Sequence, residues 1–169
     1  MTPRSPARLF WPLASILVLA DCSSKRVIEA TVSPPGTSVP VVSDVLRFTL
    51  AYNPGAAFSM RFGPYQRWVL IGLACLILYT LARAYRSVTR TGTLGTAGLA
   101  CVVGGAVGNL LDRLISNRGV VDFIDVGLNG SRFYVFNLAD AFISVGAMLL
   151  AFALWREEFA PTPARPADA

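Results

Sequence analysis

The chain has 169 residues, of which 54% are hydrophobic and only 15% charged, with a net charge of +5 and no histidine. Soluble domains carry about 25% charged residues, so this composition predicts a membrane protein. The missing imidazole excludes Ser-His-Asp and Cys-His catalysis and zinc bound through histidine. Three separated cysteines without a C-x-x-C pair predict neither disulfides nor a metal site. The Lys and Arg residues are scattered, so we expect no nucleic-acid partner, and we expect no metal or cofactor.

Four apolar stretches approach the length of about 20 residues that a helix needs to cross a bilayer. They cover residues 9–26, 67–84, 94–111 and 136–155. The first is short in strictly apolar residues and recruits flanking polar ones. We therefore expect an all-α polytopic membrane protein with one four-helix domain over residues 1–156. Pro and Ala dominate the end of the chain, so residues 157–169 are expected to form a disordered tail.

Basic residues predict the orientation of the spans. Arg4 and Arg8 precede the first span, and Arg83, Arg86 and Arg90 crowd the end of the second span and its short connection to the third. Because short cytoplasmic segments are enriched in Lys and Arg, both termini are expected to be cytoplasmic. Residues 27–66 and 112–135 then lie on the opposite side, although these segments also contain arginines.

The first of these outer segments has the composition of a small β-sheet. The run from Val41 to Tyr52 is rich in Val, Leu, Phe, Thr and Tyr, and it is bounded by Pro40 and by Asn53-Pro54-Gly55. Such a run between turn residues predicts one or two strands. A small sheet on the outer membrane surface is expected.

The amino terminus resembles a secretory signal that ends in Leu19-Ala20-Asp21-Cys22. A lipoprotein signal would place a small residue before the cysteine, whereas this chain has Asp21. Three further spans also follow. We therefore interpret this segment as a membrane span and not as a cleaved signal.

Polar residues gather where the spans meet the outer surface, and such residues are functional candidates in membrane proteins. The clusters are Asp21 with Lys25, Asn53 to Phe58, Gly104 to Arg113, Val120 to Asp125, and Phe136 to Asp140. Because the expected topology puts all of them at one interface, they predict a polar pocket that opens outward.

Simpler interpretations of the same residues stay open. The glycines at 104, 105 and 108 could serve helix packing alone. Asp21 and Lys25, four apart on a helix, could be a structural ion pair. Asp112 with Arg113 could be a solvated helix end, and Asp125 a surface carboxylate in a polar loop.

Asp122 and Asp140 are harder to explain as surface residues, because both have apolar neighbours in the sequence. Two carboxylates that meet in a desolvated place share one proton and titrate as a unit. Aspartic proteases activate water and polarise a peptide carbonyl with such a pair, which needs no histidine. The sequence does not show that the two residues meet, but the segment between them is short enough to fold back.

Together these motifs resemble prolipoprotein signal peptidase, the type II signal peptidase of bacteria (aspartic peptidase family A8). The motifs are Asp21-x-x-x-Lys25, Asn53-x-Gly55-Ala56-Ala57-Phe58-Ser59, Gly104-Gly105-x-x-Gly108-Asn109-x-x-Asp112-Arg113, Val121-Asp122-Phe123 and Phe136-Asn137-x-Ala139-Asp140. Their order and spacing match over nearly the whole chain. Pro54 departs from the expected Thr, and Ala141 from a frequent Ser.

The resemblance implies four transmembrane helices with a small extracytoplasmic sheet and an interfacial helix over the site. It implies an inner-membrane aspartic endopeptidase that cuts prolipoproteins just before the diacylglyceryl-modified cysteine and is inhibited by globomycin. By the same resemblance Asp122 and Asp140 are the catalytic pair, and Asp112 is structural. The residues implied to bind substrate or hold the pair are Asp21, Lys25, Asn53, Asn109, Arg113 and Asn137. The expected partners are prolipoprotein substrates and membrane lipid, and the protein is expected to be a monomer.

There are two alternative functions. A small transporter would need polar groups along the full depth of the spans, whereas residues 67–84 offer few. A noncatalytic assembly factor is distinguished from an enzyme only by a cleavage assay.

Overall fold

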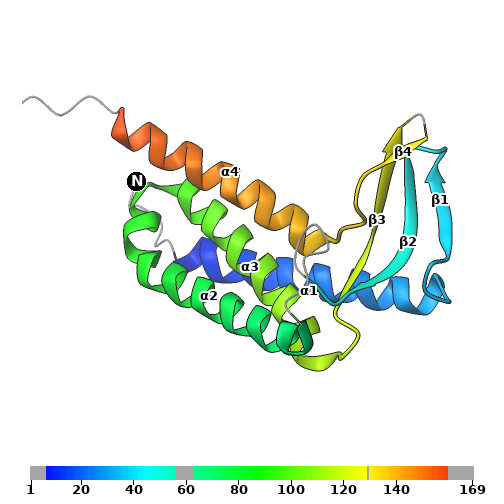
Figure 1. Ribbon diagram of the computed structural model, residues 1–169. Coiled ribbons are helices and arrows are strands. Elements are labelled where there is room, and N and C mark those ends of the chain that lie inside the picture. Colours follow the sequence, from blue (N-terminus) through cyan, green and yellow to red (C-terminus); the bar gives the residue numbers. More distant parts are fainter. Residues whose placement is uncertain (1–6, 56–62, 129, 160–169) are drawn as a thin grey trace, which may run out of the picture.

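The computed structural model describes residues 7–55, 63–128 and 130–159. Four long helices lie side by side, and a small sheet stands at one end of them (Figure 1). The helices are α1 (Ala7–Thr31), α2 (Gln66–Arg90), α3 (Thr93–Ile115) and α4 (Leu138–Glu158), and a single 3-10 turn, η2 (Gly63–Tyr65), precedes α2. The strands are β1 (Ser38–Val42), β2 (Leu46–Asn53), β3 (Val120–Leu128) and β4 (Ser131–Arg132).

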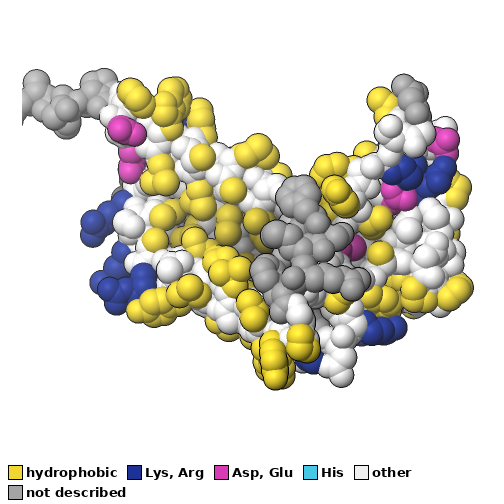
Figure 2. All heavy atoms as spheres, viewed as in Figure 1, with side chains coloured by type: hydrophobic (Ala, Val, Ile, Leu, Met, Phe, Trp, Pro, Cys, Tyr) yellow, Lys and Arg dark blue, Asp and Glu magenta, His cyan; other side chains and the backbone are white. Residues whose placement is uncertain are grey.

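All four helices are long and apolar enough to cross a membrane, which confirms the predicted spans. Their outward faces carry large apolar side chains that are more than half exposed, as expected of surfaces that contact lipid. These include Trp11, Leu19, Trp68, Leu73, Leu76, Met148 and Trp155. Figure 2 shows hydrophobic side chains over much of the helical face, and basic side chains both at the end opposite the sheet and on the sheet.

The helices extend beyond the predicted spans. α1 continues to Thr31, and its last turns lie beneath the sheet. α4 includes Glu157 and Glu158, which the sequence assigned to a disordered tail; they stay helical because the first helix-breaking residue is Pro161. Residues 160–169 of that tail and the run 56–59 of the predicted motif lie outside the described residues. Among the described residues, only the short turn η2 corresponds to the expected interfacial helix.

Helix α3 lies at the centre of the bundle and contacts each of the other three helices. Glycine permits these approaches. Gly104 lies against α1, and a Cβ at Gly105 would lie 2.4 Å from the carbonyl oxygen of Ala139 in α4. A Cβ at Gly108 would lie 2.4 Å from Oδ2 of Asp21. The packing interpretation of these glycines is therefore confirmed, and Gly108 also makes room for a carboxylate.

The sheet is antiparallel with the order β1-β2-β3-β4. β2 confirms a strand in the predicted run 41–52. β1 begins earlier, at Ser38, and contains Pro40, which was expected to bound the run, and β3 was not predicted. Ile28 and Val32 at the end of α1 pack with Leu50, Val121 and Phe123 from the sheet, and all five are buried. This small core fixes the sheet on the end of α1.

Asp125 was expected to be a surface carboxylate in a loop, and that expectation was wrong. It lies in β3 and is 5% exposed. Arg132 donates to it at 2.6 Å and Thr49 at 2.8 Å. Burial opposes ionisation, yet these donors and the charge of Arg132 hold the pKa of Asp125 below its ordinary value. Asp125 thus ties β2, β3 and β4 together.

Candidate active site

A cleft of about 590 Å³ lies between the sheet and the ends of the helices. It is lined by the end of β2, the start of β3, the segment before α4 and the facing turns of α3 and α4. Its polar lining residues include Asn53, Gln66, Asn109, Arg113, Asp122, Asp140 and Ser144, and its apolar ones include Phe133, Val135, Phe136 and Ile143. The lining of the cleft thus combines polar and apolar side chains.

Asn137 joins the two acidic residues of the cleft. It is the N-cap of α4: its Oδ1 accepts the backbone N–H of Asp140 at 3.0 Å, and Asp140 Oδ2 accepts the N–H of Asn137 at 3.3 Å. This reciprocal capping box begins the helix. With Oδ1 so engaged, Nδ2 faces the strand and donates to Asp122 Oδ1 at 2.6 Å. One buried amide therefore orients both carboxylates.

Asp122 projects from β3 and is 3% exposed. Asn53 Nδ2 donates to its second oxygen, Oδ2, at 3.0 Å. Burial and the nearby charge of Asp140 raise the pKa of Asp122 to about 6, although the two amide donors oppose the shift. Near pH 6, therefore, this carboxyl exchanges between its two protonation states.

Asp140 lies in the first turn of α4 and is held from α3. Asn109 Nδ2 donates to Asp140 Oδ1 at 2.8 Å. The Oδ1 of Asn109 accepts from Lys25 Nζ at 3.1 Å and from Asn137 Nδ2 at 3.2 Å. The direction of the Asn109 amide is therefore fixed by its neighbours.

Lys25 is the centre of a charge cluster behind the cleft. Its Nζ lies 2.7 Å from Asp21 Oδ2 and 2.9 Å from Asp112 Oδ2. The predicted pairing of Asp21 with Lys25 is confirmed. Asp21 Oδ1 accepts the backbone N–H of Ala139 at 2.9 Å. Asp112 accepts the backbone N–H of Val121 at 3.2 Å, so it is not a solvated helix end. The cluster links α1 and α3 to α4 and β3.

Arg113 reaches from α3 toward the turn that follows β2. It donates to the carbonyl of Asn109 at 3.1 Å and to the carbonyl of Gly55 at 3.4 Å. Its guanidinium adds a positive charge to the lining of the cleft, near Asp140 and Asp122. Arg113 therefore provides both a structural contact and a charge beside the acidic pair.

The structure brings the eight predicted site residues together at one end of the bundle. Asn53, Asn109, Arg113, Asp122 and Asp140 line the cleft. Asp21, Lys25 and Asn137 are at most 2% exposed and lie behind these residues. The last three therefore contact the residues of the cleft wall.

Sequence reasoning missed two features of the site. The apolar run Phe133 to Phe136 forms part of the wall, and its position just before Asn137 was the available signal. Gln66 also lines the cleft, but a single polar residue at the start of an apolar span gave no hint of a role.

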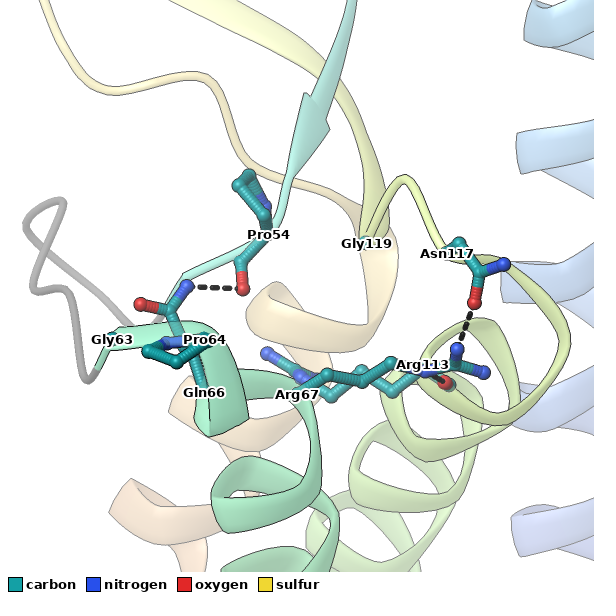
Figure 3. Close-up of a pocket in the computed structure, with 8 residues that line it drawn as sticks. All are labelled: Pro54, Gly63, Pro64, Gln66, Arg67, Arg113, Asn117 and Gly119. Atoms are coloured by element: carbon teal, nitrogen blue, oxygen red, sulfur yellow. Dashed lines mark hydrogen bonds between the residues drawn. The ribbon is translucent and has the colours of Figure 1, made fainter.

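A second hollow of about 420 Å³ adjoins the cleft and shares Pro54, Gln66 and Arg113 with it (Figure 3). Arg67 extends across this hollow to the end of α3. It donates to the carbonyls of Arg113 and Leu114 at 2.6 and 2.9 Å and to the side chain of Asn117. These contacts satisfy carbonyls that a helix end leaves without partners, and a cation is favourable there. Arg67 thus fixes the end of α3 to α2.

This fold and site define a polytopic membrane protein with a paired-carboxylate cleft at one end of its helices. The family model for signal peptidase II matches residues 13–156. The lipoprotein signal peptidase of Ectopseudomonas mendocina is 40% identical over 152 residues, covering 88% of this chain and 89% of that protein. The corresponding protein of Cellvibrio japonicus is 43% identical over 148 residues, covering 83% of each.

A solved structure described as a bacterial membrane enzyme superposes with a TM-score of 0.79 at 27% sequence identity, covering 92% of both chains. The chain belongs to the signal peptidase II family, as the resemblance of its motifs implied.

Proposed function

We propose that this protein is an aspartic endopeptidase that removes signal peptides from diacylglyceryl-modified prolipoproteins, cutting just before the lipidated cysteine. The observation that carries the proposal is the pairing of Asp122 and Asp140 through Asn137 at a cleft on the end of an apolar bundle. The relatives named lipoprotein signal peptidase support the substrate class. The family and these names favour neither a transporter nor an assembly factor.

The chemistry starts with one carboxyl and one carboxylate. The carboxylate takes a proton from water as the water oxygen bonds to the scissile carbonyl carbon. The carboxyl gives its proton to the carbonyl oxygen, which produces a neutral gem-diol. When the C–N bond breaks, the group that took the proton from water gives it to the leaving nitrogen. The group that gave its proton to the carbonyl oxygen takes one back from a hydroxyl of the diol. The pair thus returns to its starting state.

Neighbouring amides hold both carboxyl groups in place during this exchange. Asn53 and Asn137 donate to both oxygens of Asp122, and Asn109 donates to Asp140. Each carboxylate is thus stabilised in place while its protonation changes. Arg113 is proposed to bind carbonyl oxygens of the substrate backbone, and Asp21 and Lys25 to hold the cleft wall from behind.

The form of the cleft suits a lipid-anchored substrate. The cleft has apolar lining residues, among them Phe136 and Ile143, and the outward faces of the helices are apolar as well. The signal helix of the precursor would enter sideways from the bilayer, and its acyl chains would remain in lipid. A cleft at the membrane surface therefore gives direct access to the cut site.

The proposed location is the bacterial inner membrane, with the cleft on the periplasmic face and both termini cytoplasmic. In Figure 1 the described start of α1 and the end of α4 lie at the end opposite the sheet. Arg83, Arg86 and Arg90 belong to the last turns of α2 at that same end. The positive-inside tendency supports this orientation. Both acidic residues and the described side chains that orient them come from one chain, which supports a monomeric enzyme.

Cleavage of a purified diacylglyceryl-modified prolipoprotein in detergent tests the proposal. Asp122→Asn and Asp140→Asn are expected to fold and to lose at least about 10³-fold in kcat, because each removes a proton carrier. Asp44→Asn is the control, since that carboxylate is 80% exposed in the turn after β1. The unmodified precursor should not be cut, and globomycin should block cleavage. Appreciable turnover by either dyad variant would show that the pair is assigned wrongly.

A further inference from the structure

Gln66 is a buried amide that the proposed chemistry leaves without a role. It is the first residue of α2 and is 9% exposed. It forms part of the wall between the acidic cleft and the hollow of Figure 3. In that view its side chain is directed away from the helix toward Pro54, and its Nε2 donates to the Pro54 carbonyl at 2.5 Å.

The carbonyl that Gln66 contacts belongs to the turn that carries Asn53. In this turn Asn53 Oδ1 accepts the backbone N–H of Gly55 at 3.0 Å. An Asn side chain that accepts a hydrogen bond from the backbone N–H two residues later forms a local turn. Because Oδ1 is used in this way, Nδ2 faces the strand and donates to Asp122 at 3.0 Å. The direction of the Asn53 amide thus depends on the turn.

Each backbone carbonyl of this turn contacts a different segment of the chain. The Asn53 carbonyl lies against Gly119, where an added Cβ would come within 2.2 Å of the oxygen. Arg113 of α3 donates to the Gly55 carbonyl at 3.4 Å. Pro54 has no N–H, so its carbonyl is its one backbone hydrogen-bonding group, and α2 holds it through Gln66.

We propose that Gln66 is a positioning residue of the peptidase: by holding the Pro54 carbonyl, it fixes the Asn53 turn and keeps the Asn53 amide directed at Asp122. This inference deepens the proposed function and rests on it. Gln66 acts through Asn53 and does not itself contact the scissile bond. A role confined to packing would change stability without changing the titration of the acidic pair.

The first test compares Gln66→Met, which keeps the length of the side chain and loses the amide, with wild type in the prolipoprotein assay. We expect kcat to fall about tenfold with KM changed less than about twofold. Gln66→Lys, which restores a donor of similar reach, should recover at least half of that loss on a logarithmic scale. Tyr65→Phe is the matched control, because the neighbouring Tyr65 is 72% exposed and should cleave like wild type.

The pH profile supplies a readout that packing alone would not move. Asp122 is faced by Asp140 from α4, Lys25 from α1 and Arg113 from α3, and by the amides of Asn53 and Asn137. The Asn53 hydrogen bond lowers the pKa of Asp122, so a displaced Asn53 should raise it. We expect the limb of the kcat profile that Asp122 governs to move to higher pH in Gln66→Met by at least about 0.3 unit. An unmoved profile would overturn the inference.

A double-mutant cycle decides whether Gln66 acts through Asn53. Once Asn53→Ala has removed the amide, the further change Gln66→Met should alter kcat less than about twofold. Two losses that simply multiply would overturn the inference. If Gln66→Met fails to fold, Gln66→Glu replaces it, because Glu keeps the size of the side chain and lacks the Nε2 donor.

Wild type and Asp122→Asn, assayed alongside, separate this inference from the proposed function. If wild type did not cleave the prolipoprotein, or if Asp122→Asn did, the proposed function itself would be contradicted. An active wild type with an inactive Asp122→Asn and an unaffected Gln66→Met would contradict the role of Gln66 alone.

Discussion

Replacing Lys25 with Met removes the only cation of the cluster formed by Asp21, Lys25 and Asp112. Lys25 is 2% exposed, and its Nζ lies 2.7 Å from Asp21, 2.9 Å from Asp112 and 3.1 Å from Asn109 Oδ1. Met has nearly the same length, so the change leaves little cavity. The main effect is that Asp21, which is fully buried, and Asp112, which is 18% exposed, lose their common counter-ion.

Removing one partner of a buried ion pair costs about 3–5 kcal/mol, because the other charge stays buried. Asp112 retains some access to water, so we expect the free energy of unfolding of Lys25→Met to fall by about 3–4 kcal/mol. Reversible unfolding in mixed micelles, followed by circular dichroism, measures this difference. Arg26→Met is the matched control on the next residue. The side chain of Arg26 pairs with Glu29 and is 70% exposed. Exposed pairs contribute about 0–1 kcal/mol.

A second variant checks the origin of the loss. In Lys25→Met the added change Asp21→Asn should restore part of the stability, since it removes one uncompensated charge. A loss below about 1 kcal/mol in Lys25→Met would refute the reasoning, because it would mean that water screens the cluster. A double variant less stable than Lys25→Met would refute it as well.

Two further predictions concern packing and protons. Gly108→Ala should destabilise the fold and reduce cleavage, because the new Cβ would lie 2.4 Å from Asp21 Oδ2. Gly72→Ala is the control and should be neutral or slightly stabilising, because no atom lies within 4 Å of the added Cβ. Thermal unfolding and the cleavage assay compare the two variants, and equal behaviour would contradict the packing argument. The pKa of Asp122 is raised in the fold from 3.8 to about 6, so its protonated form is favoured by folding. Protonated Asp122 therefore contributes roughly 2–3 kcal/mol to the free energy of unfolding below about pH 4, and this contribution is lost as the pH rises through about 6. The free energy of unfolding, measured across this pH range, should fall in wild type and should not fall in this way in Asp122→Asn. An unchanged pH dependence in the variant would assign the proton to another group.

Much of the architecture could be predicted because membrane helices are specified by local composition. Twenty apolar residues in a row have few alternatives, and the arginines near Arg86 indicated a direction. The strands around Phe48 also carried a local signal of β-branched and aromatic residues. The meeting of Asp21 with Lys25 followed from their spacing on one helix.

Strand β3 was missed because its acidic residues conceal its pattern. Asp122 and Asp125 interrupt an otherwise apolar run, which suggested a polar loop. Their partners come from distant positions, Asn53 and Asn137 for one and Arg132 for the other. A single sequence does not display such pairings. Gln66 was missed for the same reason, since its importance lies in the turn that it contacts and not in its neighbours along the chain.

The capping amide of Asn137 has a consequence for how the protein is made. It belongs to the last helix, yet it holds Asp122 of β3, while Asn109 and Lys25 reach it from helices synthesised earlier. The cleft therefore cannot exist in a chain that has inserted only three helices or whose sheet has not yet docked. Completion of the acidic pair coincides with completion of the fold, so a half-built chain in the membrane carries no organised site.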